Sequence, residues 1–490
     1  MISIRHRWPA AVLAALLAAP AIARANELGD DLAARRERVM QRLGPDAMAI
    51  LWSAPRRTYS LDVDYEYRQD SNLYYLTGLT QPETVLVLMP GNASRREILF
   101  VKERDSAREH WEGVRLAPDE AAERTGIRTV LGSGQFEAFV SAIFERREFD
   151  AKTLPGPETA TFVDALAAGR ARVALLRQAA GENERPTAAS DFARRVRDRF
   201  SGVDVVNLTP ILSDLRVVKT PYERRLLVKS LEISGEAHKA GMLAARPGAY
   251  EYEVKAAVET VYRGRGAVSW SYPAIVASGP NSTILHYPDA VRQMRAGDLL
   301  LIDAAGNYSY MSGDITRTYP VGGTFSPAQK DIYSVVLQAQ EEAMKVARAG
   351  STLRDIHNRT VDVIREGLLR LGLITDATGD QYRMWYTHGA SHYIGIDVHD
   401  VGDRTRALAP GTAFTIEPGI YIRQSALDAL ARTPENLALA QRLRAAVAKY
   451  ADIGVRVEDS FLLEETGLRR LSGNVPRTID EIETFMRKRK

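Results

Sequence analysis

The chain has 490 residues, 45% of them hydrophobic and 26% charged, which is typical of a globular protein and too long for one core, so two domains are expected. Its net charge of +3 comes from arginines within residues 1–25, since residues 26–490 carry 62 basic and 62 acidic groups. This balance excludes a bulk electrostatic attraction to nucleic acid or anionic lipid, and the absence of cysteine excludes disulfides, thiolate nucleophiles and Cys-type zinc sites.

Residues 1–25 are predicted to be a signal peptide. Arg5–Arg7 is a basic stretch, Ala10–Ala19 is an apolar run, and Ala23–Ala25 offers small residues at the positions that flank a cleavage site. The apolar run is shorter than the ~20 residues needed to span a bilayer, so a cleaved signal is favoured over a retained anchor. We therefore expect an exported, periplasmic protein with no membrane span after cleavage.

Residues 26–212 are predicted to form an N-terminal, doubly wound α/β domain. A charged helix is expected at Arg35–Leu43, and buried parallel strands at Ala47–Trp52 and Thr84–Met89. A further strand is expected at Ile98–Val101.

Two stretches of this domain have weaker patterns. Tyr65–Tyr75 is aromatic and polar without a clean period, and is either a solvated loop or a surface that reaches a site or partner. Residues 165–205 are rich in Ala, Arg and Glu, which predicts helices and a connecting region.

The second domain is expected at residues 213–490 and begins with a long helix. Thr220–Glu223 combines an N-cap threonine, a proline at the first helical position and the glutamate of a capping box. The helical pattern continues to about Ala245. A second helix at 250–263 and an extended run at 271–277 follow.

A predicted hairpin carries two acids. The buried strand Leu299–Ile302 ends at Asp303, Gly306–Asn307 is a turn signal, and the next extended run carries Asp314. The two carboxylates can therefore lie side by side across the hairpin, where they repel each other unless a cation lies between them. Either aspartate alone would more often be a turn or surface residue.

Three of the eight histidines of the chain fall within twelve residues, 388–399. The spacing of His388 and His392 is that of a zincin helix, but Gly389 stands where that motif requires glutamate, which argues against a zincin. Two further acids, Glu417 and Glu458, end strand-like runs.

Two aspartates, two glutamates and one histidine make an oxygen-rich donor set. Such a set suits Mn²⁺ first, with Zn²⁺, Co²⁺ or Fe²⁺ as alternatives. Four carboxylates carry more negative charge than one divalent ion neutralises, so two ions are expected. Two such ions can share a water, lower its pKa and together polarise a carbonyl.

At these residues the chain resembles the pita-bread metallopeptidases, which include aminopeptidase P, prolidase and methionine aminopeptidase. Their metal-ligand series is similar to Asp303, Asp314, His392, Glu417 and Glu458. Four phrases resemble the proline-specific branch and the N-terminal domain of aminopeptidase P: residues 313–318, 388–402, 416–421 and 67–78. The resemblance implies a pita-bread catalytic domain after the α/β domain.

The resemblance also implies roles for the metal ligands. Asp314 and Glu458 would bridge the two ions, Asp303 would hold one ion, and His392 and Glu417 would hold the other. Glu417 would also accept the proton of the attacking water, in a reaction carried out by a hydroxide that both ions activate.

Substrate contacts are implied in the same way. His286 and His399 would stabilise the tetrahedral intermediate, and four residues would line a pocket for the proline of the substrate: His388, Tyr272, Tyr421 and Arg456. A peptide bond to proline has no N–H, so an apolar ring pocket beside imidazole donors suits this substrate.

The expected function is a Xaa-Pro aminopeptidase acting on peptides with proline at the second position, as a homodimer or homotetramer like its family. A Xaa-Pro dipeptidase is the alternative, because the insertion Arg423–Asp452 and the ending Val475–Glu483 are prolidase-like. A cytosolic methionine aminopeptidase would need no export signal. A creatinase-like hydrolase or a binding module on this fold should lack several of the five ligands.

Overall fold

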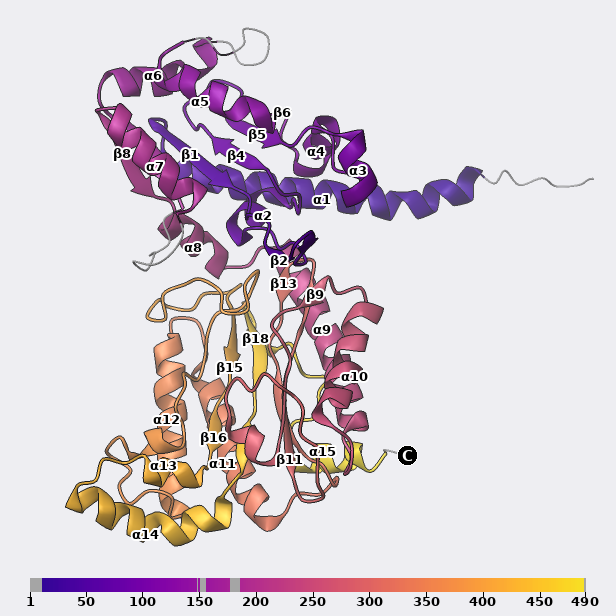
Figure 1. Cartoon of the computed structure of the whole chain (residues 1–490), viewed down its shortest axis with the longest axis vertical. Helices are drawn as coiled ribbons and strands as arrows, with labels where there is room; N and C mark the ends of the chain where they lie inside the picture. The colour runs from indigo at the N-terminus through magenta and orange to yellow at the C-terminus, as the bar shows by residue number, and fades with distance from the viewer. Residues whose placement is uncertain (1–10, 148, 150–155, 177–185, 489–490) are drawn as a thin grey trace, which may run out of the picture. The chain divides into compact units, whose positions relative to one another are not determined.

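The computed structural model describes residues 11–147, 149, 156–176 and 186–488, and only the backbone of residues 11–26 (Figure 1). The chain divides into two compact units, Met1–Leu215 and Arg216–Lys490. Of the predicted signal peptide, residues 1–10 lie outside the described residues, and the remainder begins helix α1 (Ala11–Leu43). None of the described helices is long and apolar enough to cross a bilayer. Cleavage of the signal therefore stays a prediction.

A mixed six-stranded sheet forms the centre of the first unit, with the strand order β6-β5-β4-β1-β7-β8. The strands are β1 (Ala47–Trp52), β4 (Val85–Leu88), β5 (Glu97–Val101), β6 (Thr129–Gly132), β7 (Ala171–Leu175) and β8 (Val203–Asn207), beside a hairpin of β2 (Thr58–Ser60) and β3 (Val63–Asp64). The remaining α-helices are α2 (Ser71–Thr77), α3 (Ser106–Glu112), α4 (Pro118–Thr125), α5 (Phe136–Phe144), α6 (Ala160–Ala167), α7 (Ala188–Arg199) and α8 (Thr209–Val217).

Helices cover both faces of this sheet. The buried side chains of α5, α6 and α7 form one apolar core with alternate residues of the strands. The buried residues of α1 and α2 lie outside that core, and both helices contact β1. This is the α/β layering expected from the sequence.

Strand direction and strand number differ from the prediction. β4 pairs antiparallel with both β1 and β5, whereas β1 pairs parallel with β7. A strand that is buried on both faces has the same apolar pattern in either direction, so the pattern alone does not reveal its orientation. The stretch 165–205, predicted as helices and a connection, contains β7 and β8, because neighbouring strands impose extended structure on a segment of weak preference.

The aromatic segment at Tyr65–Tyr75 ends in a short helix. Asp70 caps α2 by accepting from the backbone N–H groups of Asn72 and Leu73, and Gly78 closes the helix in a left-handed conformation with φ 64°. Leu73 and Tyr75 are fully buried, so this end of the segment is structural.

In the second unit, two helix pairs flank small antiparallel sheets (Figure 1). The α-helices are α9 (Pro221–Ala244), α10 (Glu251–Gly264), α11 (Pro327–Val346), α12 (Leu353–Arg370), α13 (Gln424–Asp428), α14 (Pro434–Tyr450) and α15 (Ile479–Met486). The strands are β9 (Ser269–Trp270), β10 (Ile275–Ser278), β11 (Leu299–Asp303), β12 (Gly306–Tyr308), β13 (Met311–Ser312), β14 (Thr316–Pro320), β15 (Ala413–Ile416), β16 (Gly419–Tyr421), β17 (Gly454–Arg456), β18 (Asp459–Glu464) and β19 (Gly467–Arg470).

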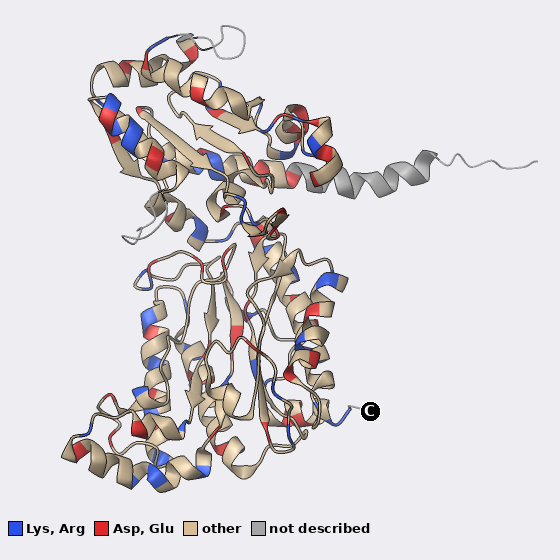
Figure 2. Cartoon of the chain, in the orientation of Figure 1, with Lys and Arg blue, Asp and Glu red and all other residues tan. Residues whose placement is uncertain are grey.

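The first helix of this unit begins as the sequence predicts. Thr220 accepts from the N–H of Glu223, and the Glu223 carboxylate accepts from the N–H of Thr220, which completes the capping box. The predicted second helix corresponds to α10, and the predicted helical insertion contains α13 and α14. Acidic and basic side chains are interspersed over both units, as the charge balance indicates (Figure 2).

We expect Thr220→Ala to lower the free energy of unfolding by about 1 kcal/mol, because the first turn of α9 loses its cap. The midpoint of urea denaturation measures the change. Thr260→Ala is the control, since Thr260 lies exposed inside α10 and its hydroxyl only bonds back to the carbonyl of Ala256. Equal midpoints for the two variants would contradict the prediction.

The hairpin that carries Asp303 and Asp314 has its tight turn later than predicted. The turn lies at Ser309 and Tyr310, which have φ of 49° and 66°. Gly306 instead lies in β12, where a Cβ would approach the ring of Tyr262 to 3.0 Å, so glycine is needed there for close packing. Antiparallel pairing of β11 with β14 then brings the two aspartates together.

Candidate metal centre

The five predicted ligands gather in three overlapping groups in the second unit. Within each group, the potential ligand atoms lie within 4.8 Å of one another. The groups are Asp303 with Asp314 and Glu458, His392 with Glu417 and Glu458, and Asp314 with His392 and His399. Asp314, His392 and Glu458 each belong to two groups, so the set is a single continuous cluster.

Strand ends bring the four carboxylates together. Asp303 is the last residue of β11, Asp314 lies shortly before β14, and Glu417 directly follows β15. Glu458 directly precedes β18, and its backbone N–H donates to the carbonyl of Thr316 at 3.0 Å. This bond joins the sheet of β11 and β14 to the sheet of β15 and β18, so acids far apart in the sequence meet at one place.

His392 is oriented as a metal ligand. Its Nδ1 lies 3.0 Å from the carbonyl of Tyr393, which can only accept, so Nδ1 carries the proton. Nε2 then faces the acids, at 3.4 Å from Asp314 Oδ2, 3.4 Å from Glu417 Oε1 and 3.9 Å from Glu458 Oε1. A backbone carbonyl that fixes the ring in this way is a common feature of histidines that bind metals.

The cluster fits divalent cations. Oε1 of Glu458 is buried and has no hydrogen-bond partner among the described residues. Burial and neighbouring carboxylates raise the pKa of Asp314, Glu417 and Glu458. Bringing these acids together is unfavourable unless cations compensate their charge, and oxygen donors with one imidazole suit hard divalent ions.

Two predicted pocket residues contact the ligand aspartates directly. Tyr272 Oη lies 2.5 Å from Oδ1 of Asp303 and 2.5 Å from Oδ1 of Asp314, and its single proton serves one of them at a time. Arg456 Nη2 donates to Asp303 Oδ2 at 2.6 Å, and its Nη1 donates to Tyr421 Oη at 2.8 Å. These side chains therefore orient Asp303 and partly balance its charge.

His388 extends this network. Burial and the nearby charge of Arg456 lower the pKa of His388 to about 3, so the ring is neutral. Its Nδ1 donates to the carbonyl of Gly389 at 2.8 Å, so Nε2 accepts from Tyr421 Oη at 2.8 Å. The predicted pocket residues thus form a chain of hydrogen bonds that runs from His388 through Tyr421 and Arg456 to Asp303.

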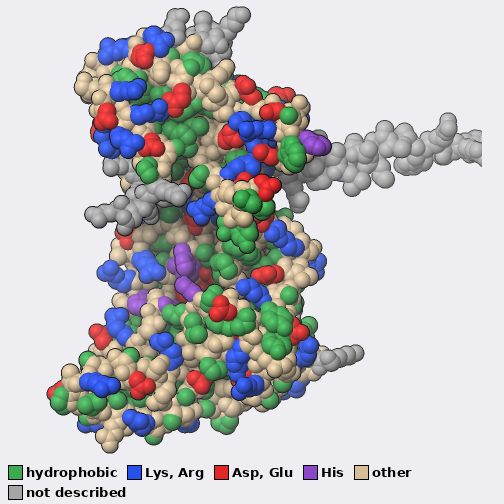
Figure 3. Space-filling model, in the orientation of Figure 1, with side chains coloured by type: hydrophobic (Ala, Val, Ile, Leu, Met, Phe, Trp, Pro, Cys, Tyr) green, Lys and Arg blue, Asp and Glu red, His purple; other side chains and the backbone are tan. Residues whose placement is uncertain are grey.

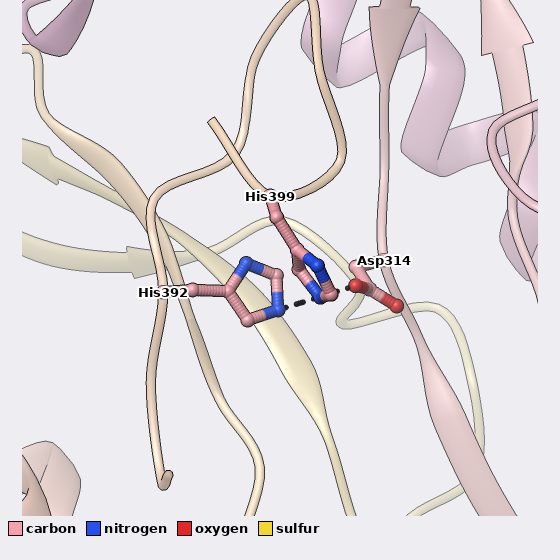
Figure 4. Close-up of side chains that lie close together, drawn as sticks. All are labelled: Asp314, His392 and His399. Carbon is pink, nitrogen blue, oxygen red and sulfur yellow. Dashed lines mark ion pairs between the residues drawn. The ribbon is translucent and has the colours of Figure 1, made fainter. Parts of the chain in front are cut away.

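His399 faces the cluster from a different segment. Its ring lies edge-on to that of His392, with centroids 4.4 Å apart, and Figure 4 shows both rings next to Asp314. His399 is exposed, yet its pKa is lowered to about 4. The main cause is desolvation of the imidazole by surrounding protein, and nearby His392 and His286 contribute less. The ring is therefore neutral at pH 7, with one N–H to donate.

His286 is exposed and lies on the stretch between η3 (Gly279–Thr283) and β11. It is near enough to His399 to lower the pKa of that residue. Histidine side chains gather on one face of the second unit (Figure 3). The structure thus brings the five predicted ligands and the predicted pocket residues together, with His399 beside them and His286 next to His399.

Several supporting residues were missed from the sequence. Buried His238 on α9 has Nε2 3.0 Å from the carbonyls of both Ala304 and Ile315, which directly follow the ligand aspartates. Its position on an apolar helix face gave no signal. Thr316 donates from its hydroxyl to Glu458 Oε2 at 2.7 Å.

Arg317 is a further supporting residue that the sequence did not reveal. It lies within β14, where every residue is buried, and its guanidinium pairs with Asp459 at 2.6 Å. It also donates to the carbonyl of Glu458 at 2.5 Å. Because β14 reads Thr-Arg-Thr-Tyr-Pro, no apolar run surrounds the arginine in the sequence, and nothing local indicated a buried ion pair.

Comparison with known proteins matches each unit to a family. Residues 225–465 match metallopeptidase family M24, and residues 32–151 match the N-terminal domain of aminopeptidase P. The Xaa-Pro aminopeptidase of Escherichia coli (strain K12) is 33% identical over 462 residues, which are 92% of this chain and 96% of that protein. The chain belongs to the Xaa-Pro aminopeptidases of family M24.

Solved structures of this family agree in fold. The aminopeptidase PepP of Pseudomonas aeruginosa has a TM-score of 0.78 and 34% identity, and the match covers 94% of this chain and 98% of that one. Aminopeptidase P of E. coli has a TM-score of 0.76 and 32% identity over the same shares. The predicted fold class, an α/β domain followed by a pita-bread catalytic domain, is confirmed. As a Xaa-Pro aminopeptidase of family M24, this protein is a metallo-exopeptidase.

Proposed function

We propose that this Xaa-Pro aminopeptidase removes the N-terminal residue of peptides whose second residue is proline, using two divalent ions with Mn²⁺ as the native metal. The observation that carries the proposal is the convergence of two Asp, two Glu and one His, from five places in the chain, on one cluster. Bound there, two divalent ions would activate a water molecule and polarise the substrate carbonyl.

The assigned ligands would divide between the ions according to their positions. Asp303 lies with Asp314 and Glu458, which would hold one ion, and His392 lies with Glu417 and Glu458 around the other. Asp314 also lies next to His392, so Asp314 and Glu458 are the two acids that reach both positions.

Glu417 would accept the proton of the attacking water. Its raised pKa, caused by burial and by Glu458, is suited to holding a proton and passing it on to the departing proline nitrogen. His388 Nδ1 lies 3.6 Å from Glu417 Oε2, but its proton is donated to the carbonyl of Gly389, so the two side chains are neighbours without a hydrogen bond.

The neutral imidazole of His399 would donate its N–H to the oxygen that becomes negative as the substrate carbonyl is attacked. His286, beside it, would contact the substrate from the exposed stretch that precedes β11. The aromatic rings of Tyr272, Tyr421 and His388 would form the side of the site that receives the proline ring.

A Xaa-Pro dipeptidase remains the second candidate, because α13 and α14 occupy the prolidase-like insertion. Buried Leu443, Val447 and Tyr450 of α14 join the main core of the unit, and Lys449 pairs with Asp331 on α11 at 3.1 Å. The insertion is thus anchored on α11. The E. coli relative is known with the inhibitor Pro-Leu, which corresponds to a product extending past proline, and this favours the aminopeptidase.

Two peptides separate the candidates. We expect the metal-loaded protein to release the first residue from both Xaa-Pro and Xaa-Pro-Yaa-Zaa, with kcat/KM higher for the longer peptide. A Xaa-Ala-Yaa-Zaa peptide is the control and should remain uncleaved. Cleavage of Xaa-Pro alone would instead identify a dipeptidase, and metal analysis of the same preparation gives the number and identity of the ions.

Export to the periplasm and self-association into a homodimer or homotetramer also belong to this proposal. The basic and apolar stretches of residues 1–25 support export, and the family supports self-association. Cell fractionation with N-terminal sequencing tests the first, and sedimentation equilibrium tests the second.

A further inference from the structure

His399 lies on a stretch of the chain that has little regular structure. Residues 387–412 form neither helix nor strand, apart from two isolated bridges, Tyr393 with Phe414 and Thr412 with Val218. An exposed histidine on such a stretch needs some other support to keep a fixed position. The residue that follows it, Asp400, attaches this part of the stretch to two buried cations, Arg216 and Lys219.

The side chain of Asp400 is buried between two cations. Its Oδ2 accepts from Lys219 Nζ at 2.7 Å, and its Oδ1 accepts from Arg216 Nη2 at 2.5 Å. Arg216 Nη2 also reaches Asp397 Oδ2 at 2.6 Å, so two cations face two carboxylates. The side chains of Arg216, Lys219 and Asp400 are at most 2% exposed.

The backbone around this cluster leaves little room for movement. Lys219 donates from Nζ to the carbonyl of Arg216 at 2.6 Å, and from its backbone N–H to the carbonyl of Gly411 at 2.8 Å. A Cβ on Gly395 would lie 2.1 Å from Asp400 Oδ2 and 2.7 Å from Lys219 Nζ. The fit therefore admits only glycine at that position.

The charges also keep Asp400 ionised. Burial raises its pKa, but Lys219 and Arg216 more than offset this effect, so the pKa lies below its ordinary value. Replacing a buried ion network by apolar side chains of similar volume is often neutral for stability. What the network adds is direction, since each carboxylate oxygen is held by a particular cation.

We propose that Arg216 and Lys219 are positioning residues for His399, which they hold in its catalytic place through Asp400. The proposal rests on the proposed role of His399 as donor to the substrate oxygen. Both cations contact Asp400, which belongs to none of the groups of potential metal ligands, so we expect their loss to change the position of His399 and leave bound metal in place.

The direct test is Lys219→Met, which removes the charge but keeps most of the length. We expect kcat to fall about 10- to 100-fold, the cost of displacing a catalytic group by about 1 Å. KM and bound metal should stay as in the wild type. Arg36→Met is the matched control, because buried Arg36 in the first unit pairs with Glu97 at 2.9 Å, and its loss should lower stability without changing kcat.

A double-mutant cycle with His399→Ala distinguishes positioning from general damage. If Lys219 acts through His399, Lys219→Met should cause little further loss of kcat in the His399→Ala background. If the losses of kcat in Lys219→Met and His399→Ala add fully, the positioning role of Lys219 is overturned, while the proposed role of His399 stands. An unchanged kcat in His399→Ala itself would overturn the role of His399, and the inference with it.

Asp397→Asn serves if Lys219→Met does not fold. The side chain of Asp397 is 37% exposed. When the charge of Asp397 is removed, Arg216 stays paired with Asp400. We expect a smaller fall in kcat, again absent in the His399→Ala background. A fall of the same size in both backgrounds would refute the proposal.

Discussion

Asp314→Ala is expected to lose bound metal and turnover together. The carboxylate lies in two of the three ligand groups, with Asp303 and Glu458 on one side and His392 on the other. Its removal takes away one of the two acids that reach both of the proposed ion positions, so the binding of both proposed ions should weaken at once. Metal content per chain after gel filtration and turnover of a Xaa-Pro-Yaa-Zaa peptide should both fall to background.

Two further variants make this result specific. Asp314→Asn keeps the shape and one acceptor oxygen but removes the charge, so we expect it to lose most, but not all, of the metal. Asp331→Ala is the control, because Asp331 lies on α11 and pairs with Lys449 on α14. Full activity in Asp314→Ala would remove this residue from the site.

His399→Ala is expected to keep its metal and lose kcat by about 10²- to 10³-fold, the usual effect of losing one donor to a developing oxyanion. The ring is neutral at pH 7 and keeps an N–H that can serve the substrate. Because His399 also lies near Asp314 and His392, metal content must be measured on the same sample as kcat.

The two measurements separate a donor from a ligand. Loss of metal in His399→Ala would place this residue among the ligands, and an unchanged kcat would deny it any role in turnover. His110→Ala is the control, since His110 lies on the exposed helix α3 in the first unit and should leave both quantities unchanged.

Local patterns in the sequence predicted much of this protein. The cap of α9 at Thr220, the long buried strand before Asp303 and the placing of acids at strand ends all depend on residues close in the chain. The five candidate ligands and the family resemblance could also be recognised from the sequence, because each motif is a short run of residues with its own chemistry.

Other features depend on contacts between distant segments. The antiparallel direction of β4 and the presence of β7 follow from neighbouring strands, because a short buried segment accepts either direction or even another structure. Gly306, which the sequence placed in the turn, packs against Tyr262 in β12, and the turn lies at Ser309 and Tyr310.

The sequence by itself determined which side chains could hold metal and carry out the chemistry, because residue type and local spacing fix the donors available. Only the tertiary structure decided what supports them: His238 beneath the two aspartates, Arg317 behind Glu458, and Lys219 holding Asp400. Buried polar groups need partners, and a partner 66 to 181 residues away is selected by the packing of the whole unit, which no local pattern records.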